Sequence, residues 1–272
     1  MHAGMIASLA IAVALYAAGF ANLLHKGRRR RARLRRAAAF AIGWLVLATA
    51  LLSPLHEMTE QLFSAHMVQH ELLMVVAAPL LVLARPLVAM LWALPRTWRR
   101  AVGRVANGRA ARSVLSVMNR PFDAWLIHGL AIWVWHLPLL FDAALENEAV
   151  HAAQHISFLG SALLFWWTII YPARRSARGM SIVYLFTTAV HTSVLGALMT
   201  MARSPWYPRY ASRSAAFGLT PLGDQALAGM IMWIPASIAY LIAALLIVRR
   251  WLGDSDLEVR RREQLDFAVS SH

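Results

Sequence analysis

Seven long apolar runs restrict what this chain of 272 residues can fold into more than any other feature of its sequence. Each run holds about 20 residues, which as an α-helix is long enough to cross a lipid bilayer. The expected spans are Met5–Leu24, Ala37–Ser53, His66–Ala84, Phe122–Phe141, His151–Tyr171, Ser181–Met201 and Gln225–Val248. The sequence therefore predicts an all-α, polytopic membrane protein with seven transmembrane helices.

These spans leave little chain for a separate soluble domain. We expect one transmembrane domain over residues 1–252 and a short cytoplasmic tail of mixed charge over residues 253–272. The apolar segment between Arg85 and Pro95 is too short to cross the membrane and has a proline at each end. It is expected to lie in the inner interface or to form a short re-entrant piece.

The distribution of basic residues predicts the orientation of the helices. All but three of the 27 lysines and arginines fall in alternate connections, at residues 26–36, 85–120, 174–178 and 249–262. The positive-inside rule makes these connections cytoplasmic. The first span has its basic cluster behind it, which is typical of a retained anchor and not of a cleaved signal peptide. We therefore expect an outside N-terminus and a cytoplasmic C-terminus, in the plasma membrane of a bacterium (the inner membrane).

The net charge of +14 is explained by this topology together with attraction to anionic membrane lipids, so no nucleic-acid partner is expected. The chain contains no cysteine, which excludes disulfides, thiolate metal sites and covalently attached c-type haem. A metal would have to be held by histidine, methionine, carboxylate or backbone oxygen. Because no nucleophile triad, phosphate loop or dinucleotide fingerprint is present, the protein is not expected to be an enzyme.

Two short motifs, HMVQH at 66–70 and HAAQH at 151–155, each place two histidines one helical turn apart. Such residues lie on nearly the same face of a helix, about 6 Å apart along its axis. Both helices enter the membrane from outside, and the outgoing span between them carries His136 near its outer end. Ionisable side chains in a membrane are costly and indicate a functional site. The sequence thus predicts one outer layer of five histidines: His66, His70, His136, His151 and His155.

The surroundings of the two motifs indicate a duplicated hairpin. A Pro-Leu pair precedes each motif at a similar distance, beginning at Pro54 and at Pro138. Two copies of a hairpin would bring matching faces together about a pseudo-twofold axis. The glutamines of the motifs, Gln69 and Gln154, are expected either to fix the tautomer of an imidazole or to form hydrogen bonds between helices.

The remaining histidines have weaker assignments. His191 lies near the middle of the sixth span and is included as a candidate ligand or relay. His128, in the inner half of the fourth span, is interpreted as a packing residue, and His56 is placed in an outer loop. No role is expected for the terminal or juxtamembrane residues His2, His25 and His272.

Histidines at positions i and i+4 can share one metal ion. Imidazole suits copper, zinc, nickel and iron, and nearby thioethers favour copper(I). Four methionines lie near the outer face: Met58, Met67, Met199 and Met201. Two other interpretations stay open at this point. His70 and His155 could ligate a b-type haem in an electron carrier, or the histidines could hydrogen-bond across helices in a metal-free scaffold.

The stretch HMVQHELLMVVAAPLLVLARP, with the later HAAQH helix and seven spans, resembles the multi-spanning CtaG family of cytochrome c oxidase (caa-type) assembly factors over Ala37–Val248. The resemblance implies a membrane protein that helps mature a haem–copper oxidase, with oxidase subunits and a periplasmic copper donor as partners. The family's histidine motifs correspond to His66, His70, His151 and His155. An unrelated single-span copper chaperone that bears the same name binds copper through cysteines, which this chain lacks.

Overall fold

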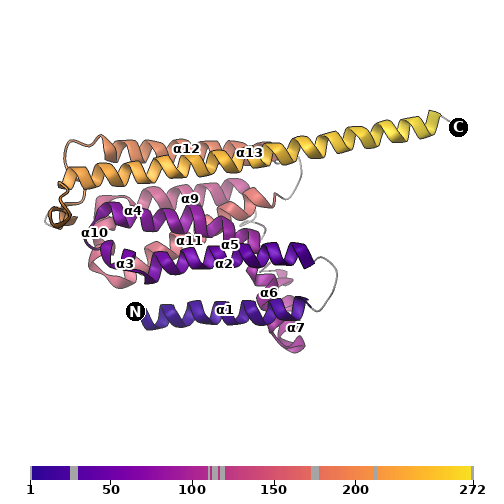
Figure 1. Cartoon of the computed structure of the whole chain (residues 1–272), viewed down its shortest axis with the longest axis horizontal. Coiled ribbons are helices and arrows are strands. Elements are labelled where there is room, and N and C mark those ends of the chain that lie inside the picture. Colours follow the sequence, from indigo (N-terminus) through magenta and orange to yellow (C-terminus); the bar gives the residue numbers. More distant parts are fainter. Residues whose placement is uncertain are drawn as a thin grey trace.

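The computed structural model describes residues 2–24, 30–109, 111, 116, 120–172, 178–210 and 213–270, and the side chains of all of these except residues 2, 3 and 254–270. Helices are the only regular secondary structure in these residues (Figure 1). The predicted all-α fold is confirmed. His25, His272 and the basic residues at 26–29, 112, 174 and 175 lie outside the described residues.

Six helices are long and apolar enough to cross a membrane unbroken. The unbroken spans are α1 (His2–Leu24), α2 (Arg30–Leu52), the continuous helix Phe63–Ala84, α11 (Glu148–Ile170), α12 (Arg178–Thr200) and the Pro221–Gly253 part of α13 (Pro221–Ser270). Beyond Gly253, α13 stays helical over the residues predicted to form a tail.

The seventh predicted span is bent. Instead of one helix over Phe122–Phe141, α9 (Pro121–Trp135) is followed by α10 (Pro138–Glu146), and the two axes differ by 75°. Leu137 is extended (φ −64°, ψ 129°) because the residue before a proline is disfavoured in the α conformation. His136 therefore lies at the corner between the two helices.

The helices run side by side, with the N-terminus at the same end as α10 and α3 (Pro54–Met58) (Figure 1). The end of α13 projects beyond the opposite end of the bundle. Chain ends on opposite faces are what an odd number of crossings requires. Which face is outside remains a prediction from the charges.

The helix Phe63–Ala84 is the most buried of the six unbroken spans. Its first part, α4 (Phe63–Glu71), packs against α13, and its last part, α5 (Ala78–Ala84), packs against α2 and α11. Between them Leu72–Ala77 forms a π-helix, whose wider winding interrupts the ordinary i to i+4 bonding. The indole Nε1 of Trp166 on α11 donates a hydrogen bond of 2.9 Å to the backbone oxygen of Met74 in this segment. A side chain of α11 thus satisfies a carbonyl within the irregular turn.

Glycines permit two close helix contacts. A Cβ atom built on Gly229 of α13 would lie 2.5 Å from the backbone oxygen of Gly196 on α12, so only hydrogen fits there. A Cβ on Gly19 of α1 would overlap the backbone oxygen of Ala89 in α6 (Pro86–Ala93). The apolar segment after Arg85 is therefore a short helix packed on α1, and α7 (Arg96–Ala106) follows it.

The order of elements around the two histidine motifs is the same. In each copy a longer helix (α2 or α9) leads to a short helix that begins with the Pro-Leu pair (α3 or α10). A helix that carries H-x-x-Q-H near its start (α4 or α11) follows. This order is what a duplicated hairpin requires, whereas the pseudo-twofold axis itself remains a prediction.

Candidate metal centre

The start of α4 is held by an acidic side chain from a distant part of the chain. The carboxylate of Asp224, on α13, accepts hydrogen bonds from the backbone N–H groups of Phe63 (2.7 Å) and Ser64 (3.0 Å). These N–H groups have no partner within the helix, and a carboxylate also interacts favourably with the positive end of the helix dipole. Asp224 is fully buried, at 0% exposure. It therefore fixes the beginning of α4 one turn before His66.

The five histidines predicted for the outer layer form one cluster. Within each motif the rings are close, at 4.4 Å between the centroids of His66 and His70 and 4.3 Å between His151 and His155. Between the motifs, His66 lies 5.3 Å from His151 and His70 lies 5.5 Å from His155. His136, from the corner after α9, is 6.3 Å from His70. Three elements of the fold thus converge on one group of imidazoles.

The tightest part of the cluster is formed by His66, His151 and His155. One ring nitrogen from each lies within 4.8 Å of the other two. Nitrogens that share one tetrahedral ion at a bond length near 2.0 Å are about 3.3 Å apart. Small rotations of the side chains would therefore close these three nitrogens around an ion.

Hydrogen bonds fix which nitrogen of two rings carries the proton. The hydroxyl of Tyr210 donates to the backbone oxygen of Thr59 (2.8 Å), so it accepts from Nδ1–H of His66 (3.2 Å). Nδ1–H of His136 donates to the backbone oxygen of Ile132 (2.6 Å). In the neutral form of both rings the lone pair therefore lies on Nε2, and both Nε2 atoms are buried without a hydrogen-bond partner among the described residues. A neutral imidazole with its lone pair on Nε2 is a form that binds metals.

The rings of His70, His151 and His155 also have nitrogen atoms without a hydrogen-bond partner in the described part of the chain. His70 is 1% exposed, and neither of its ring nitrogens has a hydrogen-bond partner in the described part of the chain. The same holds for Nε2 of His151 and of His155. A buried donor or acceptor without a partner costs free energy, so several of them together favour a ligand that would use them.

Tyr210 lies in the connection after α12, which also closes one side of the site. Burial raises the pKa of its phenol well above the ordinary value, and the nearby negative charge of Asp224 raises it further. The hydroxyl therefore stays protonated and keeps donating to Thr59. Tyr207 from the same connection donates to the backbone oxygen of His136 (2.7 Å).

His56 was placed in an outer loop by the sequence, but the structure puts it in α3 beside the cluster. Its ring stacks on that of His151 at 5.8 Å, and its Nδ1 accepts a hydrogen bond from Gln69 (3.1 Å). The same amide donates to the backbone oxygen of Ala50 on α2 (2.6 Å), so Gln69 both joins two helices and orients an imidazole. Gln154, the matching glutamine of the second motif, is also buried. The Pro-Leu pair directly before His56 is a sequence signal that could have linked it to the motifs.

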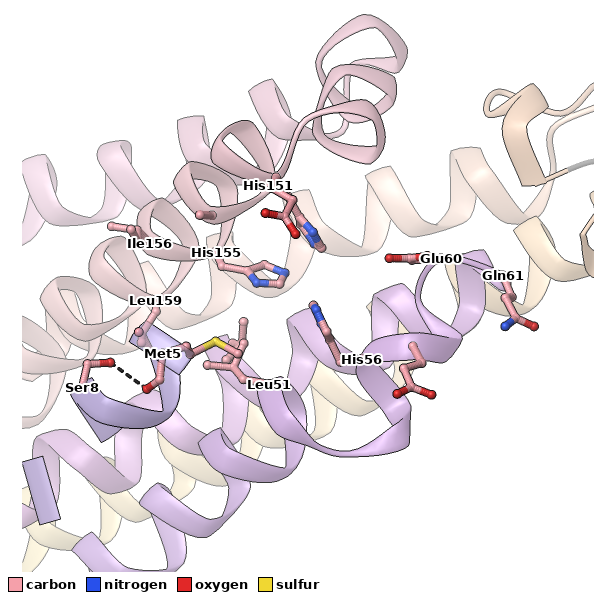
Figure 2. A pocket seen from close by; sticks show the side chains of 15 residues that line it. Met5, Ser8, Leu51, His56, Glu60, Gln61, His151, His155, Ile156 and Leu159 are labelled. Atoms are coloured by element: carbon pink, nitrogen blue, oxygen red, sulfur yellow. Dashed lines mark hydrogen bonds between the residues drawn. The ribbon is translucent and has the colours of Figure 1, made fainter. Parts of the chain in front are cut away.

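A cavity of about 600 Å³ reaches the cluster from the end of the bundle that holds the N-terminus (Figure 2). His56, His151 and His155 line it, and their rings point toward a common space. Met5 of α1 adds a thioether to the wall. Three carboxylates also line the cavity, those of Glu57, Glu60 and Glu148.

Two further histidines lie outside this cluster. His191 on α12 accepts a hydrogen bond from Nε1 of Trp133 (3.3 Å), and the structure does not bring it to the other predicted ligands. His128 interacts with the hydroxyl of Ser161 (3.1 Å) and stacks on Phe165. Of the four methionines expected near the site, Met67 and Met199 are buried in the core and Met58 and Met201 are exposed.

These observations define a class of protein: a polytopic helical membrane protein with a buried, cysteine-free group of imidazoles near one end of its helix bundle. Comparison with known proteins then gives the family. The family model for the cytochrome c oxidase caa3 assembly factor (Caa3_CtaG) matches residues 14–254, so this chain belongs to that family. The resemblance drawn from the histidine motifs is confirmed.

Three similar curated proteins come from mycobacteria, and all are described as uncharacterized. Those of Mycobacterium bovis and Mycobacterium tuberculosis are each 27% identical over 265 residues, which cover 91% of this chain and 38% of the relative. That of Mycobacterium leprae is 24% identical over 278 residues, covering 96% of this chain and 41% of the relative. The chain thus spans about two fifths of the length of these relatives. No solved structure matches the chain.

Proposed function

We propose that this protein binds copper through the outer histidine cluster and supplies it to cytochrome c oxidase during assembly in the bacterial inner membrane. The family supports a role in oxidase assembly. The observation that carries the metal proposal is the group of three ring nitrogens, from His66, His151 and His155, within 4.8 Å of one another. The metal is cargo in this proposal, and no reaction is catalysed.

The donor set favours copper over the hard cations. Imidazole nitrogens suit copper and zinc, whereas calcium and magnesium prefer oxygen ligands. A neutral imidazole whose Nε2 makes no hydrogen bond can bind a cation without releasing a proton. His70 and His136 lie next to the three-nitrogen group and offer further ligands to which an ion could move.

The cavity provides a route to these ligands from outside the bundle. Glu57, Glu60 and Glu148 give its wall negative charge, which concentrates cations from solution. His56 lines the same cavity as these carboxylates, and its ring lies 5.8 Å from that of His151. A cation can therefore pass from carboxylates to imidazoles by successive exchange of single ligands, and a periplasmic donor or an oxidase subunit would meet it at the same opening.

The test is a copper(I) titration of the purified protein against a coloured chelator. We expect close to one copper per chain, and a loss of binding in the variant that combines His66→Ala and His155→Ala. His191→Ala is the matched control, because it removes an intramembrane imidazole outside the cluster and should leave the stoichiometry unchanged. Equal binding by all three proteins would contradict the proposal, as would full oxidase maturation by the double variant.

The same preparations distinguish the other two interpretations. A b-type haem carrier would show a Soret band as purified, and the band would disappear when His70 or His155 is replaced. A metal-free scaffold would bind neither copper nor haem, and its histidine variants would differ from the wild type in stability alone.

A further inference from the structure

A second cavity, of about 310 Å³, lies at the end of the bundle opposite the histidine cluster. It is enclosed where α5 and α11 end, where α12 begins, and beside the inner part of α13. Three arginines contribute to its wall, Arg85, Arg178 and Arg250. No carboxylate is present among the described residues that line it. The described part of its lining is therefore positive, and it lies on the face that the charge distribution predicts to be cytoplasmic.

Arg85 is held in an unusual conformation at the centre of this wall. Its backbone is left-handed (φ 50°, ψ 55°), and it is the only residue other than glycine with a positive φ in the described ranges. An L-residue adopts this conformation at a cost, which is typical of positions that serve a function. Its guanidinium lies 3.8 Å from the centre of the Tyr171 ring, which fixes the position of the charge.

The guanidinium of Arg85 also has an unused donor. Its Nε atom is buried and has no hydrogen-bond partner in the described part of the chain. A buried charged donor without an acceptor is costly, so an anion that accepts from it would be bound favourably. The planar guanidinium matches the geometry of phosphate oxygens.

The rest of the wall indicates where the anion comes from. Ile169 and Ile170 at the end of α11 and Ile247 on α13 line the same cavity as the arginines. Phosphate groups beside hydrocarbon chains are the pattern of a membrane phospholipid, and basic cavities between the cytoplasmic ends of helices are known lipid sites. We propose that this cavity binds the phosphate headgroup of an anionic phospholipid, with the partly exposed Ile170 and Ile247 against its acyl chains.

This site is independent of the metal centre, since the two lie at opposite ends of the same helices. The experiment is native mass spectrometry of this 272-residue chain in neutral detergent, titrated with phosphatidylglycerol or with phosphatidylcholine. The wild type should bind one phosphatidylglycerol with higher affinity than phosphatidylcholine. Arg250→Gln should raise the dissociation constant about fivefold, as expected for the loss of one basic residue near a lipid phosphate.

Arg249→Gln is the matched control, because it removes the same charge from the neighbouring position of α13, outside the cavity wall. Its affinity should equal that of the wild type. Arg85→Gln should lower the affinity for phosphatidylglycerol more than Arg250→Gln does. Arg250 is tested as well because it is exposed, so its replacement should not disturb folding. Equal weakening by the Arg249 and Arg250 changes would reduce the effect to general surface charge and overturn the proposal.

Inorganic phosphate distinguishes the two sources of the anion. Competition by millimolar phosphate against phosphatidylglycerol would support recognition of the phosphate group. Binding of phosphate without any preference for phosphatidylglycerol over phosphatidylcholine would overturn the lipid assignment.

Discussion

Asp224 ties the last helix to the start of the first histidine helix, and its removal is a direct test of how the metal centre is built. Its carboxylate accepts two backbone hydrogen bonds from α4 and is fully buried. Hydrogen bonds to a charged group contribute about 1.5–3 kcal/mol each, and two that share one carboxylate are less than additive. We therefore expect Asp224→Ala to lower the free energy of unfolding by about 3 kcal/mol. Asp224→Asn keeps an oxygen acceptor but loses the charge, so it should cost roughly half as much.

The assay is unfolding by dodecyl sulfate in mixed micelles, followed by tryptophan fluorescence, with copper affinity measured on the same samples. Asp123→Ala is the control, because this half-buried aspartate also lies in the first turn of a helix, where a carboxylate contributes less than about 1 kcal/mol. Because α4 begins at the capped residues, copper affinity should fall with stability in the Asp224 variants. If Asp224→Ala and Asp123→Ala unfold at the same denaturant concentration, the capping argument is wrong.

Three further predictions concern the connection after α12 and the helix contacts. Tyr210→Phe removes the acceptor that fixes the tautomer of His66, so copper affinity should fall about 10- to 100-fold in chelator competition. The hydroxyl of Tyr207 bonds only to a backbone oxygen, so Tyr207→Phe should lower the affinity less. Burial raises the pKa of Tyr207 and Tyr210 in the folded state above the unfolded value near 10. Their contribution to the free energy of unfolding should therefore be fully present below pH 10 and should fall as the pH rises further. A free energy of unfolding that stays constant from pH 9 to 11 would refute this. Gly229→Val should lower the yield of folded protein in size-exclusion chromatography, since its side chain would meet α12, while Gly103→Val, where a Cβ meets nothing within 4 Å, should behave like the wild type.

The parts of the structure that the sequence predicts are those that depend on local spacing. The lengths of the apolar runs gave the spans, and the i, i+4 spacing within HMVQH and HAAQH placed each histidine pair on one helix face. The position of His136 near the end of its predicted span also predicted that it would lie at the depth of the cluster. Depth says nothing about the direction in which a side chain points around its helix, however, and His191 on α12 points to Trp133 instead.

The supporting residues could not be predicted because their contacts join distant parts of the chain. Tyr210 is 144 residues from His66, and Asp224 is 161 residues from Phe63. Neither has a motif of its own, and each is recognisable only once the connection after α12 is seen to fold over the site. The bend after His136 was missed for a different reason: apolar content suggested one continuous span, although Pro138 marks the break.

The hydrogen bond from Trp166 to the backbone of Met74 has a mechanical consequence. It joins the two helices that carry the histidine pairs, and both of its residues follow the motif in their own helix. The carbonyl that accepts it belongs to the π-helical turn. Sliding either helix along its axis by one turn, about 5.4 Å, would break this bond in a medium that offers no replacement partner. This bond therefore helps to hold the two helices in axial register, with the imidazoles of both motifs beside each other.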